Sequence, residues 1–238
     1  MDKRSGFIHS EPAVYIFTGH YGSGKTETAV NFARYLRRLD SSDARRIALL
    51  DMDTVNPFFR SADAEEFLRA INVRLEAPLY ANSNVDMPAL PGTMGALIRD
   101  PSWDVILDIG GDDMGARAVG SYSDDILTRT CERFFVVNAL RPFTGTVRDA
   151  AKIFDEIGAA ANVPATAVIN NTNLLDETGP EMIFRGFELA EELAASRGLT
   201  VAFNMVPEQI FDEVLAHGDP RVNETNTIPL TRTVKRLF

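Results

Sequence analysis

The stretch from Gly19 to Thr26, GHYGSGKT, holds residue types that bind phosphate. It satisfies the spacing GxxxxGK[ST], in which backbone N–H groups point inward at an anion. Lys25 can reach the β and γ phosphates of a nucleotide, and the Thr26 hydroxyl can bind Mg²⁺. A glycine turn beside a surface lysine is the alternative interpretation. The residues expected at the phosphates are Gly19, His20, Tyr21, Gly22, Ser23, Gly24, Lys25, Thr26 and Glu27.

Two acidic segments each end a hydrophobic run. LLDMD carries Asp51 and Asp53, and VILDIGG carries Asp108 and Gly111. Because ligands of a parallel α/β sheet bind at the carboxyl ends of its strands, we expect these carboxylates to face the phosphates. Asp108 can hold Mg²⁺ through water, and the glycines leave the next backbone segment free to respond to a γ phosphate. The alternatives are a helix cap for a segment beginning near Pro57, and a solvated turn after Asp108.

Short apolar segments alternate with helical segments along the chain, which is typical of βαβ units. Most apolar segments do not alternate strictly in polarity, as expected of strands buried on both faces. We therefore predict an α/β fold with a doubly wound, mostly parallel sheet flanked by helices on both faces. Strands are expected near residues 13–17, 46–50, 104–109, 133–137, 165–169 and 200–204, with a weaker one near Val73. Helices are expected over 24–39, over 146–157, and from a capping box at Thr178 to Gly198.

The composition narrows the class of protein. The 238 residues carry 24 Lys and Arg against 34 Asp and Glu, a net charge of -10, which argues against a nucleic-acid partner. The one cysteine, Cys131, is expected to be a small buried thiol. The sequence shows no signal peptide and no apolar run that could span a membrane, so we expect a cytoplasmic protein. Without a linker or a repeat, residues 1–238 are interpreted as a single domain.

Two segments leave alternatives open. Residues 78–101 are interpreted as a loop and short helix over the sheet, or as an insert that faces a partner. The last residues, TRTVKRLF, form with Leu230 a short basic amphipathic pattern that could contact a membrane. Eight residues are few for such a helix, so a terminal segment docked on the domain is preferred.

Several of these motifs carry a family resemblance. GHYGSGKT, DMDTVNP and DIGG, in this order and spacing, resemble the MinD/ParA/CobQ branch of P-loop ATPases, SIMIBI-class proteins with a deviant Walker A motif. The likeness covers nearly the whole chain, since VVNALRPFTGTVRDAAKIF, AVINN and NMVPEQ also resemble segments of that family. Within it, the chain is similar to an uncharacterised bacterial group that lacks the signature lysine.

The resemblance implies roles for residues at the phosphates. Lys25 and Thr26 would contact phosphate and Mg²⁺, and Asp51 would lie near the outer shell of the metal. Asp53 would orient the attacking water, and Asp108 would be the Walker B-like acid. The implied catalytic residues are thus Lys25, Asp53 and Asp108, and the implied metal-binding residues are Thr26, Asp51 and Asp108.

The resemblance also implies how the rest of a nucleotide is bound. Gly111 would sense the γ phosphate, and Asn170 and Pro207 would line the base pocket. A guanine-reading NKxD motif needs Lys and Asp where this chain has Asn171 and Asn173. The missing Asp favours ATP over GTP.

One departure from the family lies inside the loop. The family's signature lysine, which reaches the partner subunit's phosphates in a dimer, is replaced by His20, so a permanent charge is lost. Arg117 is a candidate substitute cation, and a solvated helix arginine is its alternative.

These inferences lead to two function hypotheses. The first is a Mg²⁺-dependent ATPase of low basal turnover that exchanges ATP and ADP and switches conformation, as a homodimer, to control a protein partner. The second is an ATP-dependent small-molecule kinase, ligase or synthetase, which would need an acceptor pocket beside the γ phosphate.

Overall fold

The structure, a computed structural model, describes residues 6–40, 42, 44–53, 64–77, 92–111 and 113–233, and the side chains of 113 and 114 lie outside this description. Its described strands form one sheet with the order β3-β2-β4-β1-β5-β6-β7-β8. Every neighbouring pair of these strands is parallel. The predicted α/β class is confirmed, and the described sheet is parallel throughout rather than mostly so.

Seven strands coincide with the predicted apolar segments, including the weak one at Val73. The strands are β1 (Val14–Thr18), β2 (Arg46–Asp51), β3 (Val73–Glu76), β4 (Trp103–Asp108), β5 (Cys131–Val137), β6 (Ala167–Asn170), β7 (Val201–Pro207) and β8 (Thr227–Leu230). The sequence analysis missed β8, which is four residues long and contains Pro229. A proline has no N–H for a sheet ladder, but an edge strand tolerates it, and β8 pairs only with β7.

Helices fill the connections between these strands. The α-helices are α1 (Lys25–Leu39), α2 (Glu65–Ala70), α3 (Gly92–Arg99), α4 (Asp113–Gly120), α5 (Ser123–Leu127), α6 (Val147–Ala161), α7 (Pro180–Ala195) and α8 (Phe211–Ala216). Short 3₁₀ turns lie at η2 (Leu175–Glu177) and η3 (Glu208–Ile210). Among the described residues, none of the helices combines the length and apolar character that a membrane span requires.

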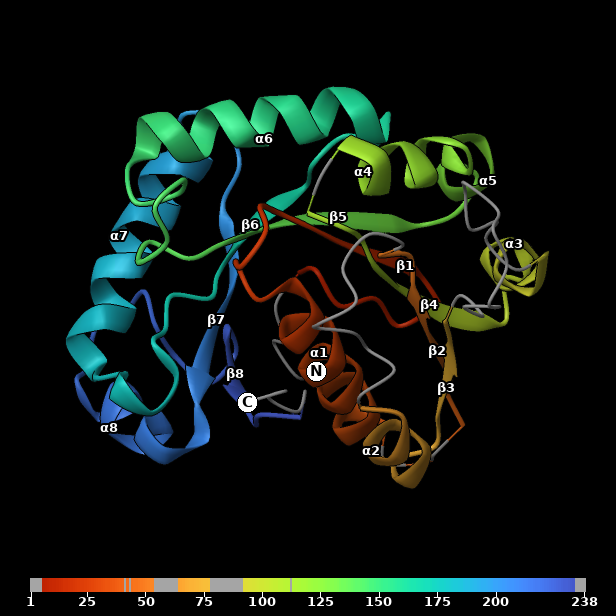
Figure 1. Cartoon of the computed structure of the whole chain (residues 1–238). Helices are drawn as coiled ribbons and strands as arrows, with labels where there is room; N and C mark the ends of the chain where they lie inside the picture. The colour runs from red at the N-terminus through yellow and green to blue at the C-terminus, as the bar shows by residue number, and fades with distance from the viewer. Residues whose placement is uncertain are drawn as a thin grey trace, which may run out of the picture.

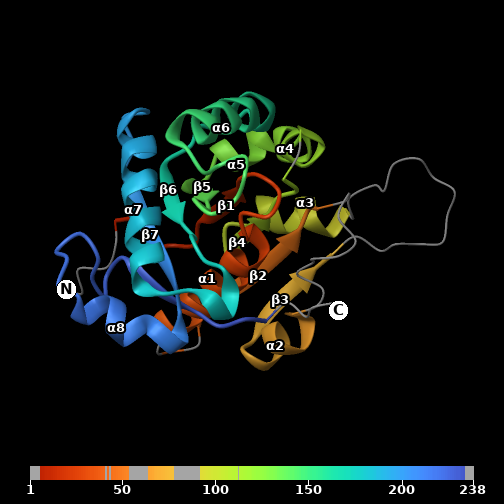
Figure 2. The same cartoon turned by 60° about the vertical axis from the view of Figure 1, so that its left-hand side comes forward.

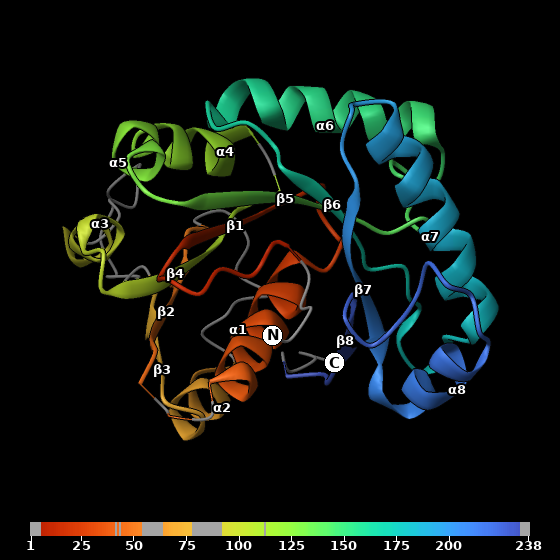
Figure 3. The ribbon, with the colours of Figure 1, turned by 180° about the vertical axis from the view of Figure 1, so that it is seen from behind.

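Alternate residues of the strands bury against opposite helical layers. In β1, Tyr15 and Phe17 pack with Phe32 of α1 on one face, whereas Val14 and Ile16 pack with α3 and α5 on the other. Figure 1 shows α1 on one side of the sheet and α6 across the other. In Figure 2 the helices α4, α5 and α6 lie together on the side away from α2, and Figure 3 shows α7 and α8 beside β7. Helices therefore cover both faces, as predicted.

Two helix ends differ from the prediction. α6 continues through Gly158 to Ala161 and ends at Asn162, which adopts a left-handed conformation with φ 51°. The capping box at Thr178 does not form, because Gly179 is the residue that precedes α7. The Thr178 hydroxyl instead accepts from Leu174 N at 2.9 Å and donates to Leu175 O at 2.7 Å, which closes the preceding turn.

The two ambiguous segments are partly described. Residues 92–99 form the short helix of the first interpretation, and residues 78–91 lie outside the description. Leu230, assigned to an amphipathic terminal helix, is instead the buried end of β8, and residues 231–233 dock on α1, while 234–238 lie outside the description. Cys131 is only partly buried, and burial raises the pKa of its thiol.

Candidate functional site

The glycine-rich loop connects β1 to α1, the context that phosphate binding requires. Its turn is closed by Ser23 N, which donates to His20 O at 3.1 Å. Gly24 precedes α1 with φ 82°, a conformation that favours glycine, and a Cβ atom there would overlap the Asn171 amide nitrogen. A larger residue at Gly24 would therefore displace Asn171.

Lys25, the first residue of α1, extends back over the loop. Its side chain is buried, with 7% exposure, and Nζ donates to His20 O at 3.3 Å. A Cβ atom built on Gly111 would lie 3.0 Å from this Nζ and 2.6 Å from Tyr21 N. The ammonium group of Lys25 therefore lies where the loop meets the turn that follows β4.

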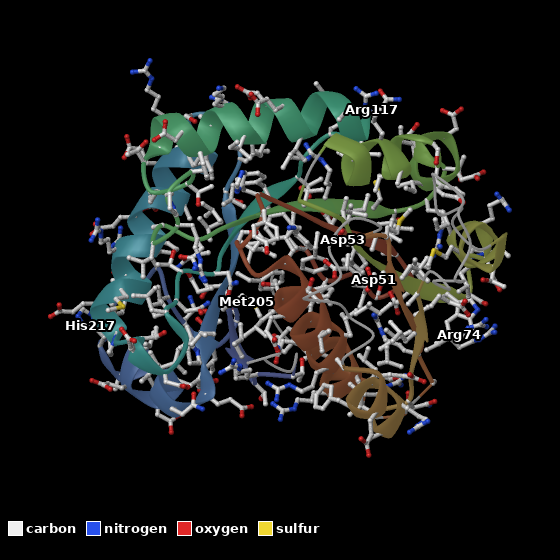
Figure 4. All side chains as sticks on the ribbon, viewed as in Figure 1. Asp51, Asp53, Arg74, Arg117, Met205 and His217 are labelled. Atoms are coloured by element: carbon white, nitrogen blue, oxygen red, sulfur yellow. The ribbon has the colours of Figure 1, made fainter. Side chains whose placement is uncertain are left out.

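The three predicted carboxylates gather at the ends of two adjacent strands. Asp51 of β2 and Asp108 of β4 are register partners, and both are almost fully buried. Asp53 N donates to Asp51 Oδ1 at 3.0 Å, which fixes the chain as it leaves β2. Figure 4 shows Asp51 and Asp53 in the central part of the molecule. Because β4 also pairs with β1, this acidic edge lies beside the strand that leads into the loop.

Oxygen ligands suit Mg²⁺, so Asp51, Asp108 and the Thr26 hydroxyl fit the predicted metal. Among the described residues there is no group of three or more His, Cys, Asp or Glu that could enclose a metal ion. Mg²⁺ keeps several waters and usually binds protein through one or two carboxylates together with substrate phosphates. The residues present therefore suit a metal that arrives with a phosphorylated ligand.

His20 and Tyr21 form the outer rim of the loop. His20 Nδ1 donates to Tyr21 O at 3.0 Å, and its ring lies 5.0 Å from the ring of Phe143. Tyr21 and Phe143 are exposed by 57% and 62%. Two large aromatic side chains near His20 are therefore exposed to solvent.

Asn171 is a functional candidate that the sequence analysis did not assign to the site. Its amide Nδ2 donates to Ser23 O at 2.7 Å and to Gly24 O at 3.4 Å, so it supports the loop from β6. The side chain is 1% exposed. The pair of asparagines in AVINN was a signal of this role, but the sequence alone did not show which of the two reaches the loop.

Asn170, predicted to read the base, is packed under α7. Its Nδ2 donates to Ile183 O and to Asn204 Oδ1, both at 3.0 Å, and its Oδ1 accepts from Thr172 N at 3.1 Å. The residue has no exposed surface. These bonds use both amide hydrogens, so the arrangement does not favour base recognition by Asn170. Pro207 lies at the carboxyl end of β7, paired with Leu230.

Glu27, expected near the phosphates, holds the C-terminal part of the chain. Its Oε1 accepts from Thr233 N at 2.5 Å and from Thr233 Oγ1 at 2.7 Å. Glu27 therefore lies on the side of α1 that faces residues 231–233.

Arg117, the candidate substitute cation, is exposed on α4. In Figure 4 it lies at the outer edge of the molecule near α6, away from Asp51 and Asp53. This position favours the alternative interpretation, an arginine on the solvated face of a helix.

Comparisons with known proteins bear on the fold. FtsY from Thermotoga maritima is 19% identical, with a TM-score of 0.55 over 87% of this chain and 66% of its own. The 54 kDa signal recognition particle protein from Aeropyrum pernix K1, solved in complex with GDP, is 18% identical, with a TM-score of 0.53 over 85% of this chain and 43% of its own. Chloroplast FtsY from Physcomitrella patens is 17% identical, with a TM-score of 0.53 over 83% and 59%.

These likenesses show that the chain has the same α/β fold as these proteins. At this level of identity they show the fold alone, and the chain spans 43 to 66% of the length of these structures. No protein-family model matches the sequence. A search of curated proteins also found no match.

Proposed function

We propose that residues 1–238 form one nucleotide-binding domain that binds ATP with Mg²⁺, hydrolyses it slowly and changes conformation with the nucleotide state. The observation that carries this proposal is the meeting of three elements at one sheet edge. The glycine loop after β1 and the turn at Gly111 adjoin Lys25. The carboxylates lie at the ends of β2 and β4, and β4 pairs with β1. Such a site combines backbone N–H groups, a buried cation and metal-binding acids.

Binding of phosphate by the loop is supported by its local geometry. The start of α1 directs backbone N–H groups and the positive end of the helix dipole toward the loop. Ser23 Oγ is buried at the loop and has no hydrogen-bond partner among the described residues. A phosphate oxygen is a suitable acceptor for such a hydroxyl.

Mg²⁺ would be held by Thr26, Asp51 and Asp108 together with the nucleotide phosphates. The metal, when bound, supplies positive charge that offsets the charge on the transferring phosphoryl group. Lys25 would add its ammonium to the same phosphates. Asp53, two residues beyond the end of β2, would orient the attacking water.

The preference for ATP over GTP rests on the turn after β6. Asn173 stands where a guanine-reading motif has Asp, and its Nδ2 donates to Asn171 O and Oδ1 at 3.0 and 3.1 Å. No carboxylate is available at this position to accept the N–H groups of guanine. GTP is the competing candidate, because one of the structurally similar proteins was solved with GDP.

The switch would act through the loop and the turn after β4. Gly111 lies against the Tyr21 backbone, so a γ phosphate at the loop would displace or draw in this turn. The exposed Tyr21 and Phe143 beside the loop are suited to contact a second copy of the chain. A homodimer formed with ATP, which acts on a further protein partner, is therefore part of the proposal.

Calorimetry with ATP and GTP, each with Mg²⁺, tests the nucleotide. We expect ATP to bind at least about tenfold more tightly than GTP, a difference of about 1.4 kcal/mol. Equal affinities would contradict the assignment of ATP, and the absence of any nucleotide binding would contradict the proposed function. Phosphate release, measured with and without candidate acceptor molecules, separates a hydrolase from a synthetase.

A further inference from the structure

A second positively charged side chain lies beside the glycine loop. β5 pairs in parallel with β1, with Thr18 opposite Phe135, so the turns that follow these two strands emerge side by side. The turn after β5 contains Arg141. A Cβ atom built on Gly22 would lie 3.9 Å from Arg141 Nε and 4.0 Å from Arg141 Cδ. The guanidinium group of Arg141 therefore lies next to Gly22 of the loop.

Hydrogen bonds fix the turn that carries this arginine. Arg141 N donates to Asn138 O at 3.2 Å, and Thr144 Oγ1 donates to the same carbonyl at 2.7 Å. Leu140 N donates to Asn138 Oδ1 at 3.0 Å. The ring of Phe143 also contacts the ring of His20 in the loop. The backbone of Arg141 is thus held in place relative to the loop.

The charge of Arg141 is not used elsewhere in the described part of the chain. Its side chain is exposed and makes no hydrogen bond or ion pair with a described residue. Arg197 and Arg221, by contrast, each pair with a carboxylate at 2.6 and 2.7 Å. In a chain with a net charge of -10, an arginine without such a carboxylate is available to an anionic ligand.

We propose that Arg141 binds the phosphate groups of the nucleotide from the same chain. This inference rests on the proposed function. Lys25 approaches the loop beside the β4 turn, since its Nζ adjoins Gly111, whereas Arg141 approaches beside the β5 turn. The two cations thus flank the loop from opposite sides. A guanidinium matches two phosphate oxygens at once, and it supplies a permanent charge next to His20, which has none.

The test compares Arg141→Met with Lys152→Ala by calorimetry. Arg141→Met keeps an unbranched side chain and removes the charge from an exposed position, so the fold should be retained. Equal thermal unfolding midpoints of the variant and the parent would verify this. Lys152→Ala removes an equal charge from an exposed position on α6, outside the turn that carries Arg141. The ligands are ATP, inorganic pyrophosphate and adenosine, each with Mg²⁺. Arg141→Lys tests whether a point charge can replace the planar group.

We expect Arg141→Met to raise the Kd for ATP and for pyrophosphate at least about tenfold, with adenosine binding unchanged. Lys152→Ala should bind all three like the parent, and Arg141→Lys should fall between Arg141→Met and the parent. If Arg141→Met binds ATP as the parent does, the inference is wrong. A loss confined to ATP and adenosine would overturn it too, because the arginine would then contact the base. If the parent itself binds neither ATP nor pyrophosphate, the proposed function fails before Arg141 is tested.

Discussion

Asp53 and Asp108 differ in position although both lie at the acidic edge. Asp108 is the last residue of β4 and is 1% exposed, whereas Asp53 follows β2 and is 8% exposed. Asp108 is paired in register with Asp51. In the proposed site these two carboxylates would hold Mg²⁺, and Asp53 would orient the attacking water.

Substitution of these two residues should therefore cause different defects. Asp53→Ala should keep ATP binding and lose turnover by about 100-fold or more, the effect of removing a positioned catalytic group. Asp108→Ala should instead weaken Mg²⁺-dependent ATP binding. Calorimetry and phosphate release on both variants check this separation, and identical defects in the two would reject it.

His20 should limit the rate of hydrolysis. An imidazole lacks the permanent charge of a lysine, and its ring is held by Phe143 and by the bond from Nδ1 to Tyr21 O. Placed cations stabilise the charge that develops in phosphoryl transfer. His20→Lys should therefore leave ATP affinity within about twofold of the parent and raise turnover about tenfold, measured by steady-state phosphate release. Unchanged turnover would mean that charge at this position does not limit the reaction.

At the level of single residues, the sequence predicted where the glycine loop lies, but not which side chains contact it. The spacing of Gly19, Gly24 and Lys25 was sufficient to predict the loop, because backbone conformation and charge follow from residue type. It was not sufficient to choose between Asn170 and Asn171. These neighbours point in opposite directions along a strand, and the choice depends on which face carries α7.

Element boundaries were predictable where packing and local preference agree. The six inner strands of the described sheet, β2, β4, β1, β5, β6 and β7, are almost fully buried, so their apolar runs stand out, whereas the edge strand β3 gave the weaker signal. β8 was missed because an edge strand of four residues with a proline resembles a loop. Thr178 was misassigned because its hydroxyl satisfies the turn before α7, a competition that spacing cannot reveal.

Arg34 of α1 binds the C-terminal strand β8 and the residues next to it. Arg34 is 8% exposed, pairs with Glu208 at 2.8 Å, donates to Pro229 O at 2.6 Å and bonds Thr231 Oγ1. Arg34→Ala leaves these acceptors without their donor, so it should lower the free energy of unfolding by about 2 to 4 kcal/mol. Chemical denaturation measures the loss, with the exposed Arg38→Ala as control. Equal losses in the two variants would contradict this account.

Acid should reduce the difference between Arg34→Ala and the parent. The hydrogen bond from Thr231, together with Arg34, holds the pKa of Glu208 below its usual range. The stability that comes from a lowered carboxyl pKa is present above the unfolded pKa and is lost as pH falls through the folded pKa. The difference in the free energy of unfolding between the two proteins should therefore be smaller at strongly acidic pH than at neutral pH. A difference independent of pH would exclude this contribution.

At the scale of the molecule, one parallel sheet brings separate segments of the chain to a single edge. The loop after β1 lies between the turns after β4 and β5, since these strands flank β1 in the sheet. The order of strands was not predictable from apolar periodicity, which shows that strands exist but not which of them are neighbours. The same order is what places Arg141 and Gly111 on opposite sides of the loop.

A nucleotide-dependent dimer follows from the proposed switch. With ATP and Mg²⁺, the Asp53→Ala protein should accumulate as a dimer, because it binds ATP without consuming it. Light scattering during size-exclusion chromatography gives the mass with ATP, with ADP and without nucleotide. A monomer under all three conditions would remove the homodimer from the proposal.

Calorimetric titration of the parent and of Lys25→Ala with ATP and Mg²⁺ tests the central claim most directly. Lys25 is buried beside the loop and Gly111, and in the proposed site its ammonium would meet the β and γ phosphates. Its removal should cost about 2 to 4 kcal/mol, which is a rise in Kd of about 30- to 1000-fold. The account predicts tight binding by the parent and a loss of this size in the variant. Equal affinities in the two proteins, or no binding by the parent, would contradict it.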